Sequence, residues 1–401
     1  MRLDSDLVVL FMSRSVRLLG FGALPVVLTS YLKARGLPEA LIGLLLSLAL
    51  VGDAVLSLLV TRIADSFGRK RLLMYSTALI AVAGIGFAYS RDALWLVVCA
   101  IIGTISPNGN EVGPFQAVEQ ACVSQVIPAK RRARVFGWYA MTGSLSAALG
   151  AILAGLAVES QKQNGVLEIV AEQQVFLGYA AVSLVLVLIF SRLSKRIETP
   201  SFGSSHRVVP LDSQTKRTIL HLSSLFALDS LGSALVMQSL IALYLENRFA
   251  VGAGMLGVIF AATNIVAALS TPLAGWLAER WGLVNTMVWT HIPANVFLLL
   301  FPFAPNLEWA IGLLIARFCL SQMDVPARTA LVMNVVPEEQ RSLAGGMTQQ
   351  GKLIGTSLGP VLSGLMWNTG FLVLPFVLGG ILKISYDLAI YIGFKRLEQD
   401  S

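Results

Sequence analysis

Charged side chains are scarce in this sequence of 401 residues, and so are histidine and cysteine. Asp, Glu, Lys and Arg together make up 13% of the chain, there are three histidines and three cysteines, and hydrophobic residues account for 55%. A soluble globular protein carries about 25% charged residues on average. This composition therefore excludes a soluble globule and predicts an all-α integral membrane protein.

The signatures of common enzymes are also absent. The sequence has no phosphate-binding loop of the Gly-x-x-x-x-Gly-Lys-Ser/Thr type and no nucleophile elbow. His206, His221 and His291 do not have the spacing of metal ligands. We therefore expect no enzymatic activity, no cofactor and no metal site, so that an ion or substrate gradient has to supply any energy.

Long apolar runs fill most of the chain. A helix needs about 20 apolar residues to cross roughly 30 Å of hydrocarbon. Twelve runs meet this requirement, and the segments between them are too short for a separate soluble domain. The predicted spans are 7–32, 40–61, 72–90, 93–126, 132–158, 175–191, 218–245, 252–277, 284–304, 308–335, 343–367 and 371–393.

The basic residues predict the orientation. If both termini lie in the cytoplasm, most of the 30 Lys and Arg residues fall in cytoplasmic segments. Anionic lipid headgroups at that face account for the net charge of +7, so no nucleic-acid partner is needed to explain it. We expect a multi-pass protein of the cell membrane in contact with its lipids.

A polar stretch near the middle of the chain separates two similar halves. Residues 192–217 are rich in Pro, Gly and Ser, which is typical of a flexible linker. The division predicts one six-helix half over residues 1–191 and a second over 218–401. Each half spans the membrane an even number of times, so both have the same orientation.

Several positions recur between the halves. A shift of 209 pairs Gly150 with Gly359 and Gly155 with Gly364. A charged turn over residues 65–71 returns in weaker form 214 positions later. Recurrence in the same order with matching hydropathy indicates an internal duplication.

The charged turn carries a family resemblance. It follows the pattern Gly-x-x-x-Asp-Arg-x-Gly-Arg-Lys/Arg at Asp65, Gly68, Arg69 and Lys70, and departs from it at Thr61 and Ser66. The second copy keeps Gly275, Glu279, Arg280 and Gly282 but lacks the basic cluster. The sequence thus resembles the major facilitator superfamily, and the resemblance implies a twelve-helix fold and a secondary transporter that works by alternating access. It does not indicate a substrate.

The turn is also a candidate gating element. Asp65 can accept hydrogen bonds from a helix N-terminus or a cation, Gly68 permits a tight turn, and Arg69 and Lys70 suit the headgroup region. Such a latch would hold the inner side of the protein closed in one conformation. The alternative is that the basic residues only fix the topology.

Ionisable residues inside the predicted spans are candidates for substrate binding or proton coupling. A charge at the centre of a membrane helix costs at least ~2.5 kcal/mol on insertion scales, which makes each one a functional candidate. The strongest candidates, with the polar residue Asn108 added, are Arg14, Arg17, Asn108, Glu111, Glu119, Asp324, Arg328 and Lys352. Asp53, Asp229, Arg317, Lys383 and Asp387 also lie in the spans, and Asp53 and Asp229 are either coupling sites or capped by nearby hydroxyls.

The fourth span is the richest in polar residues. Residues 106–120 contain two prolines and two glycines, which predict a break in the helix. At helical spacing, Asn108 and Glu119 share a face with Glu111 beside them. Buried carboxyl groups can relay protons, so Glu111 and Glu119 are candidate proton carriers. The alternative for these two carboxylates is a structural ion pair, for example with Arg14 or Arg17.

Other buried charges have local spacings that suggest partners. Asp324 and Arg328 stand at i and i+4, as do Lys383 and Asp387, so each pair can form a salt bridge. The shift of 209 also places Arg328 opposite Glu119, which suggests an ion pair between the halves.

The remaining buried cations and the glycines suggest further roles. Lys352 could bind an anion, and Arg14 and Arg17 could reach a substrate or extend toward the headgroups. Gly351, Gly355 and Gly359 stand at four-residue intervals, which permits close approach of a second helix.

Together these features predict a proton-coupled secondary transporter that acts as a monomer on a small organic solute. Export of drug-like or amphiphilic compounds by antiport is favoured over uptake, because the expected cavity helices are largely apolar. Two alternatives stay open. One is transport of an organic or inorganic anion bound by buried Arg and Lys, and the other is a non-transporting membrane sensor or lipid-modifying protein on the same fold.

Overall fold

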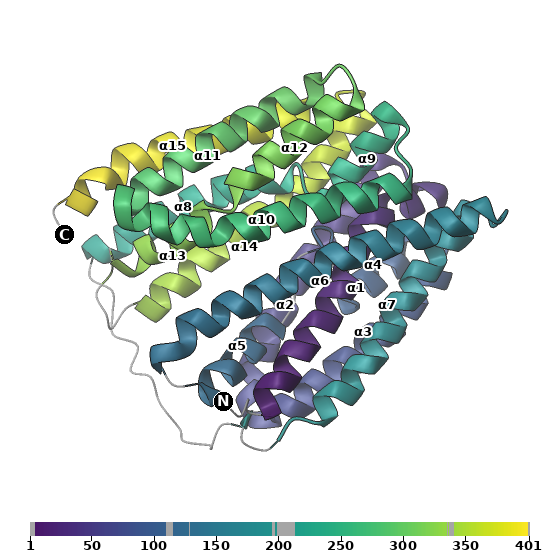
Figure 1. The fold of residues 1–401 in the computed structure, drawn as a ribbon, viewed down its shortest axis with the longest axis horizontal. Helices are drawn as coiled ribbons and strands as arrows, with labels where there is room; N and C mark the ends of the chain where they lie inside the picture. Colours follow the sequence, from purple (N-terminus) through teal and green to yellow (C-terminus); the bar gives the residue numbers. More distant parts are fainter. Residues whose placement is uncertain are drawn as a thin grey trace. The chain divides into compact units, whose positions relative to one another are not determined.

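The computed structural model describes residues 5–109, 115–127, 129–194, 197–198, 213–334, 336 and 341–399. Within these ranges the regular secondary structure is entirely helical (Figure 1). The helices are α1 (Ser5–Ala34), α2 (Glu39–Phe67), α3 (Arg69–Tyr89), α4 (Ala93–Ile102), α5 (Phe115–Val126), α6 (Ala129–Gln163), α7 (Glu168–Ser191), α8 (Ser213–Ala234), α9 (Gln238–Phe249), α10 (Ala253–Trp281), α11 (Leu283–Leu300), the short 3-10 helix η2 (Phe301–Phe303), α12 (Leu307–Ser321), α13 (Asp324–Asn334), α14 (Arg341–Asn368) and α15 (Leu374–Gln399).

These helices account for all twelve predicted spans, which confirms the all-α, twelve-span fold. Ten helical segments of the described residues are long and apolar enough to cross a membrane. The fourth span falls outside that group because it is divided between α4 and α5. The eleventh, α14, contains the polar run Gln349-Gln350-Gly351-Lys352.

Three of the spans are interrupted. The predicted break in the fourth span is confirmed, since residues 103–109 are not helical. The seventh span also breaks, at residues 235–237, and the tenth breaks between Ser321 and Asp324. Neither of these two breaks contains a proline or glycine, so local sequence did not signal them.

Tertiary hydrogen bonds explain the break in the seventh span. The Asn108 side chain accepts a hydrogen bond from the backbone N–H of Gln238 at 3.1 Å. The carbonyl oxygen of Pro107 accepts from both the backbone N–H of Ser239, at 3.0 Å, and its hydroxyl, at 2.7 Å. The broken fourth span thus supplies acceptors for the amides that begin α9, which a helix start requires.

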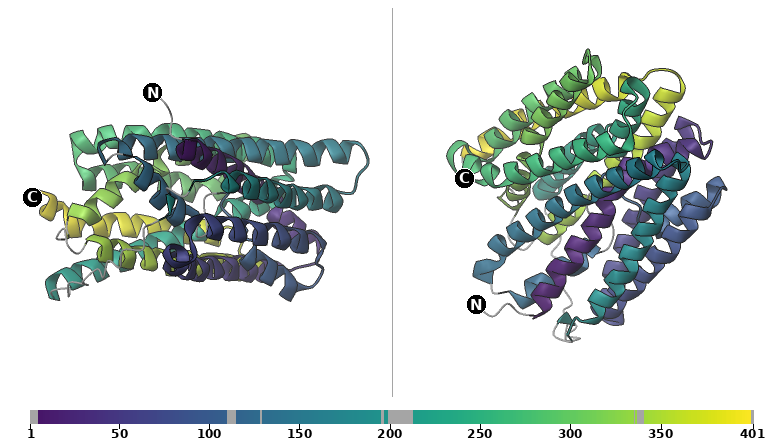
Figure 2. Two further views of the ribbon diagram at one scale, coloured as in Figure 1. Left: turned by 90° about the horizontal axis from the view of Figure 1, so that it is seen from below. Right: turned by 45° about the vertical axis from the view of Figure 1, so that its right-hand side comes forward.

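The chain divides by its contacts into two compact units. Unit 1 contains residues 1–204 and 238–264, and unit 2 contains residues 205–237 and 265–401. In unit 1, α1 packs against α6 and α7, and α3 packs against α7 (Figure 2). In unit 2, α8 packs against α14, and α11 lies along α15 (Figure 1). The division into six-helix halves joined at residues 192–217 stays a prediction.

The glycine series on α14 lies directly against α8, as its spacing predicts. A Cβ atom added at Gly351 would lie 2.4 Å from the carbonyl oxygen of Ser223. At Gly355 the corresponding distance to the carbonyl oxygen of Ala227 is 2.0 Å. No side chain fits at such distances, so glycine is what allows the two helix backbones to approach each other.

The first half repeats this packing. Gly150 on α6, which the 209-residue shift pairs with Gly359, faces the carbonyl oxygen of Leu19 on α1 at a would-be Cβ distance of 1.9 Å. Gly359 in turn faces Ala234 on α8 at 2.4 Å. Residues that match in sequence therefore serve the same packing role in both copies.

Candidate functional site

A buried polar cluster of unit 1 surrounds Glu119. This side chain on α5 is fully buried. Its carboxylate accepts hydrogen bonds from Ser13 at 3.0 Å and from Arg17 at 2.6 Å, both on α1, and from the hydroxyl of Tyr139 on α6. The ion pair with Arg17 bears out the structural alternative for Glu119, and it joins three helices at one carboxylate.

Arg14 lies beside this cluster and lines a pocket. Its guanidinium carbon is 4.2 Å from the ring centroid of Tyr139. Arg14 is 8% exposed and borders a pocket of about 300 Å³, which is completed by Gln120, Phe136, Tyr139 and Ala140. The side chain is therefore buried in the protein and does not extend freely toward headgroups.

Gly143 makes room for the Arg14 guanidinium. A Cβ atom at this position of α6 would lie 2.7 Å from Nε of Arg14. Nothing in the sequence indicated that a side chain of α1 occupies the space beside Gly143.

The predicted polar face of the fourth span is wrong. Asn108 lies in the non-helical segment 103–109, so it cannot share a helical face with Glu119. Its side chain caps the start of α9 instead. Glu111 lies outside the described residues, and its role as a proton carrier stays a prediction.

Unit 2 contains a second buried network centred on Asp229 of α8. This side chain is 3% exposed. Its carboxylate lies 2.6 Å from Nζ of Lys383 on α15 and 2.9 Å from the guanidinium of Arg328 on α13. Lys383 also donates to the hydroxyl of Ser233 at 2.7 Å. One carboxylate thus bridges cations from two other helices.

His291 on α11 connects this centre to a second carboxylate. Its Nδ1 lies 2.7 Å from Asp387 of α15, and its Nε2 lies 3.9 Å from Asp229. Asn295, one turn along α11, donates to the other oxygen of Asp387 at 3.0 Å. No role was expected for His291, because its position in the sequence does not have the spacing of a metal ligand. A histidine and an asparagine at i and i+4 in an apolar helix were the available signal.

The local pairings predicted for the buried charges have mixed outcomes. Asp324 and Arg328 form the expected i, i+4 salt bridge. The predicted pair between Lys383 and Asp387 is wrong, since Lys383 binds Asp229 and Asp387 binds His291. The packing of α15 against both α8 and α11 supplies these partners, and spacing along α15 alone could not reveal them.

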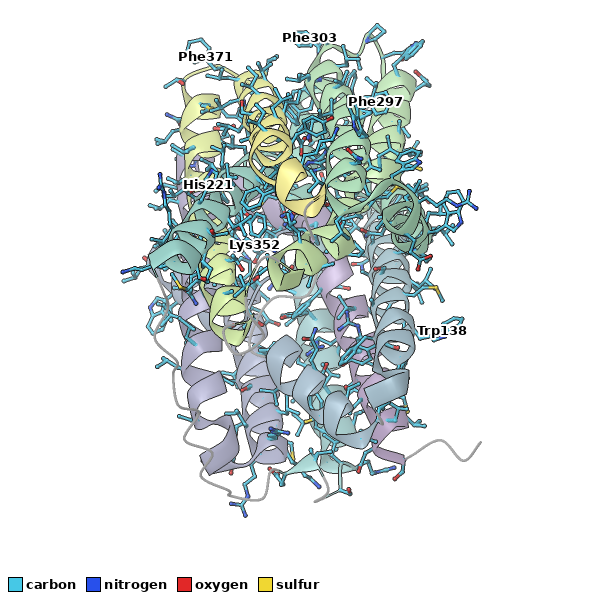
Figure 3. The ribbon with its side chains drawn as sticks, turned by 90° about the vertical axis from the view of Figure 1, so that its left-hand side faces the viewer. Trp138, His221, Phe297, Phe303, Lys352 and Phe371 are labelled. Atoms are coloured by element: carbon cyan, nitrogen blue, oxygen red, sulfur yellow. The ribbon has the colours of Figure 1, made fainter. Side chains whose placement is uncertain are left out.

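Lys352 of α14 belongs to the same region of unit 2 (Figure 3). Its Nζ is 5.2 Å from the ring centroid of Phe226, and the guanidinium carbon of Arg328 is 5.3 Å from that centroid. The two cations therefore share one aromatic ring. These ring contacts do not test whether Lys352 binds an anion, which stays a prediction.

The suggested ion pair between Glu119 and Arg328 receives no support. Each group has its counter-ion within its own unit, Arg17 for Glu119 and both Asp324 and Asp229 for Arg328. A pair between the halves stays a prediction about another conformation.

The charged turns use their glycines in the same way. Gly68 precedes α3 with φ of 96°, and Gly282 precedes α11 with φ of 84°. Backbone in this left-handed region favours glycine, which confirms the tight turn predicted at Gly68. The side chain of Asp65 lies outside the described residues, so its role as a latch stays a prediction.

The basic residues of the first turn bind protein groups at the end of α7. The backbone N–H groups of Arg69 and Lys70 donate to the Glu198 carboxylate at 2.7 and 3.2 Å. Lys70 Nζ donates to the carbonyl oxygens of Ser191 and Leu193. Glu198 thus satisfies amides at the N-terminus of α3, and Lys70 satisfies carbonyls that follow α7.

Among the described residues, no comparable contacts are made by the side chains of the second turn. Glu279 and Arg280 are exposed, and the Arg280 guanidinium carbon lies 4.1 Å from the ring centroid of Trp276. The two turns therefore share their backbone geometry and differ in what their side chains bind.

Both clusters are suited to proton and ion chemistry in an apolar surrounding. Each places buried carboxylates against buried cations. The loss or gain of one proton by a carboxylate therefore changes the net charge of an ion pair that joins two or more helices, and with it the stability of their contact.

Comparison with known proteins agrees with this architecture. The sequence profile described as Major Facilitator Superfamily matches the chain twice, over residues 10–226 and 222–395. The chain is 31% identical to the uncharacterized membrane protein YJR124C of Saccharomyces cerevisiae, over 96% of this chain and 93% of that protein. It is 23% identical to the class H tetracycline resistance protein of Pasteurella multocida, over 94% and 95% of the two chains. The crystal structure of the nucleoside transporter NupG superposes with a TM-score of 0.76 at 14% identity, covering 98% of this chain and all of that one (100%).

Proposed function

Because this chain belongs to the Major Facilitator Superfamily, we propose that it is a proton-coupled secondary transporter that exports small organic solutes. It works as a monomer in the cell membrane by alternating access, with both termini in the cytoplasm. The similarity to a tetracycline resistance protein supports a drug-like or amphiphilic substrate and antiport with protons.

The observation that carries this proposal is the environment of Glu119. Its carboxylate is fully buried and joins α1, α5 and α6 through Arg17, Ser13 and Tyr139. A proton that binds to Glu119 removes the charge that holds Arg17, and so weakens the contact among these helices. Protonation and conformation are then linked by the same ion pair.

Replacing Glu119 with glutamine tests the coupling. Glutamine keeps the size and hydrogen bonding of the side chain but cannot bind or release a proton. In liposomes loaded with tetracycline, Glu119→Gln should lower efflux driven by an imposed pH gradient at least tenfold, while exchange of tetracycline at equal pH keeps at least half its rate.

Glu168→Gln is the matched control, because Glu168 is an exposed carboxylate of unit 1 and should leave both rates unchanged. Full pH-driven efflux by Glu119→Gln would contradict the coupling role. Gradient-driven flux by the wild-type protein would also exclude a sensor or lipid-modifying protein without transport activity.

The pocket at Arg14 favours an organic anion as a second candidate substrate. A buried guanidinium against an aromatic ring, with an amide from Gln120 at the same pocket, suits a planar carboxylate. This candidate retains the fold and the transport cycle and differs only in substrate class.

Arg14→Gln tests the anion candidate. With salicylate as the probe, the substitution should raise the Kd measured by isothermal titration about tenfold, which corresponds to about 1.4 kcal/mol. Arg248→Gln is the control, since Arg248 is an exposed cation also near an aromatic ring, at 5.7 Å from the Phe249 centroid. Equal salicylate affinity in the wild type and Arg14→Gln would reject the pocket as an anion site.

A further inference from the structure

A buried carboxyl group that the Glu119 site does not use lies on α7. Glu172 is 1% exposed, and its Oε1 contacts the hydroxyl of Ser30 on α1. Its second oxygen, Oε2, is buried and has no hydrogen-bond partner among the described residues. No Lys, Arg or His side chain of the described residues lies within ion-pair distance of either oxygen.

The charged groups that face Glu172 do not neutralise it. Glu168 precedes it on α7, and Glu246 faces it from α9. Lys162, at the end of α6, is bound to Glu168 at 2.6 Å. Lys33 of α1 donates to Asn247 at 2.6 Å. The neighbours of Glu172 are thus more acidic than basic, and the nearby lysines are bound to other groups.

Arg35 of α1 is likewise committed to other acceptors. Its guanidinium donates to the hydroxyl of Tyr31 at 2.6 Å and to the carbonyl oxygen of Ala88 at 3.0 Å. The Tyr31 hydroxyl in turn donates to the Ala88 carbonyl at 2.6 Å. This group therefore supplies no counter-ion to Glu172.

Counting hydrogens favours a protonated carboxyl. The Ser30 hydroxyl has one proton but two acceptors in reach, the carbonyl oxygen of Val27 at 3.2 Å and the carboxyl of Glu172. If Glu172 is protonated, its own O–H donates to Ser30, and Ser30 donates to Val27. If Glu172 is ionised, the single Ser30 proton serves only one of the two acceptors, and a buried charge is left without a cation.

Glu119 on α5 and Glu172 on α7 contact opposite ends of α1. Both contact serines of α1, Ser30 and Ser13, which are 17 positions apart. At 1.5 Å per residue this separation is roughly 25 Å along the helix axis. Glu119 has Arg17 as its counter-ion, whereas Glu172 has none. The two carboxyl groups therefore favour opposite protonation states in this conformation.

We propose that Glu172 is a second proton-binding site of unit 1, occupied by a proton in this conformation and bonded to Ser30. The coupling role of this site rests on the proposed proton-coupled transport, and its occupancy rests on the geometry alone. On release, the O–H bond of Glu172 breaks and the proton passes to water. The resulting carboxylate keeps its bond to α1 only if Ser30 turns its proton away from Val27, and in either case a buried charge without a cation remains between α1 and α7, which destabilises their contact.

Infrared difference spectroscopy on the full-length protein in liposomes tests the occupancy without any substrate. The wild-type protein at neutral pH should show a C=O stretching band from a protonated carboxyl group that disappears on alkaline titration. Glu172→Gln should remove this band, and Ser30→Ala should shift its frequency. Glu308→Gln, at an exposed carboxylate in the first turn of α12, should leave it unchanged.

The outcomes separate this proposal from the transport proposal. A band that persists in Glu172→Gln overturns the site, even when efflux is driven by pH. A band lost only in Glu172→Gln supports the site, even when efflux proves independent of pH, and in that case the coupling proposal fails alone. Glutamine mimics the protonated side chain, so an unchanged melting temperature in Glu172→Gln also supports a neutral Glu172. A marked drop in that temperature speaks for a carboxylate.

Discussion

Replacing Asp229 with asparagine should destabilise the protein more than any other single charge removal described above. Asp229 is the only carboxylate that the structure places against Lys383 in the described part of the chain, and it also contacts Arg328. Removal of one partner from a buried ion pair typically costs 3–5 kcal/mol. We expect the melting temperature of the purified protein to fall by roughly 4–6 °C and efflux to fall at least tenfold.

The size of this effect follows from what remains behind. Without the carboxylate, Lys383 keeps one hydrogen-bond acceptor, the hydroxyl of Ser233, and His291 loses one of the two carboxylates it faces. Lys383 is 3% exposed, so water cannot replace the lost partner. Arg328 retains Asp324 and is less affected.

A double variant distinguishes the ion pair from a general packing effect. Asp229→Asn combined with Lys383→Gln removes both charges, and it should recover more than half of the lost melting temperature. Glu308→Gln, at an exposed carboxylate in the first turn of α12, is the control and should behave as the wild type. If Asp229→Asn has the same melting temperature as Glu308→Gln, the Asp229 network contributes nothing to stability.

The architecture could be predicted because it depends on features that are local or repeated. The length of the apolar runs predicts the spans, and the glycines and prolines of residues 106–120 predict the broken fourth span. Gly68 and Gly282 predict their turns because few other residues adopt the same backbone. These signals need no knowledge of which helices are neighbours.

The site could be predicted only in part, because its partners come from different helices. Asp324 and Arg328 lie one turn apart, so spacing along the chain was sufficient. Lys383 and Asp387 have the same spacing, yet each binds a group on another helix. The i, i+4 spacing shows only that two side chains of one helix are able to form a contact. The packing of neighbouring helices decides whether each of them has a closer partner on another helix.

The same limit explains the break in the seventh span. Residues 235–237 have no helix-breaking side chain, and the start of α9 depends on acceptors from residues 107 and 108, far away in the sequence. The polar residues of the fourth span thus have a structural use that their composition alone did not indicate. Asn108 looked like a cavity residue and is a helix cap.

The second large expected effect concerns the glycine series of α14. Gly355→Leu should prevent most of the protein from folding, with less than a tenth of the wild-type amount recovered as a single peak in size-exclusion chromatography. A Cβ atom at Gly355 would lie 2.0 Å from the carbonyl oxygen of Ala227 and 3.0 Å from the amide nitrogen of Leu231. These are backbone atoms of α8, and a change of rotamer cannot move them away.

The cost arises because the two helices are in contact along several turns. Gly351 and Gly359 meet α8 on either side of Gly355, so a leucine in the middle has to separate the helices over the whole series. Asp229 lies on α8, so such a separation also moves Asp229 away from Lys383 and Arg328. Its ion pairs with these two residues are then lost together with the packing.

Gly312→Leu is the matched control for this substitution. Gly312 lies within α12 of the same unit, it is exposed, and a Cβ atom there meets no atom within 4 Å. The control should be recovered in wild-type amounts, which separates steric overlap from any effect of leucine on helix stability. Gly355→Ala should give an intermediate yield, since one methyl group requires a smaller displacement than four carbon atoms. Recovery of Gly355→Leu equal to that of Gly312→Leu would show that α8 and α14 do not depend on this close approach.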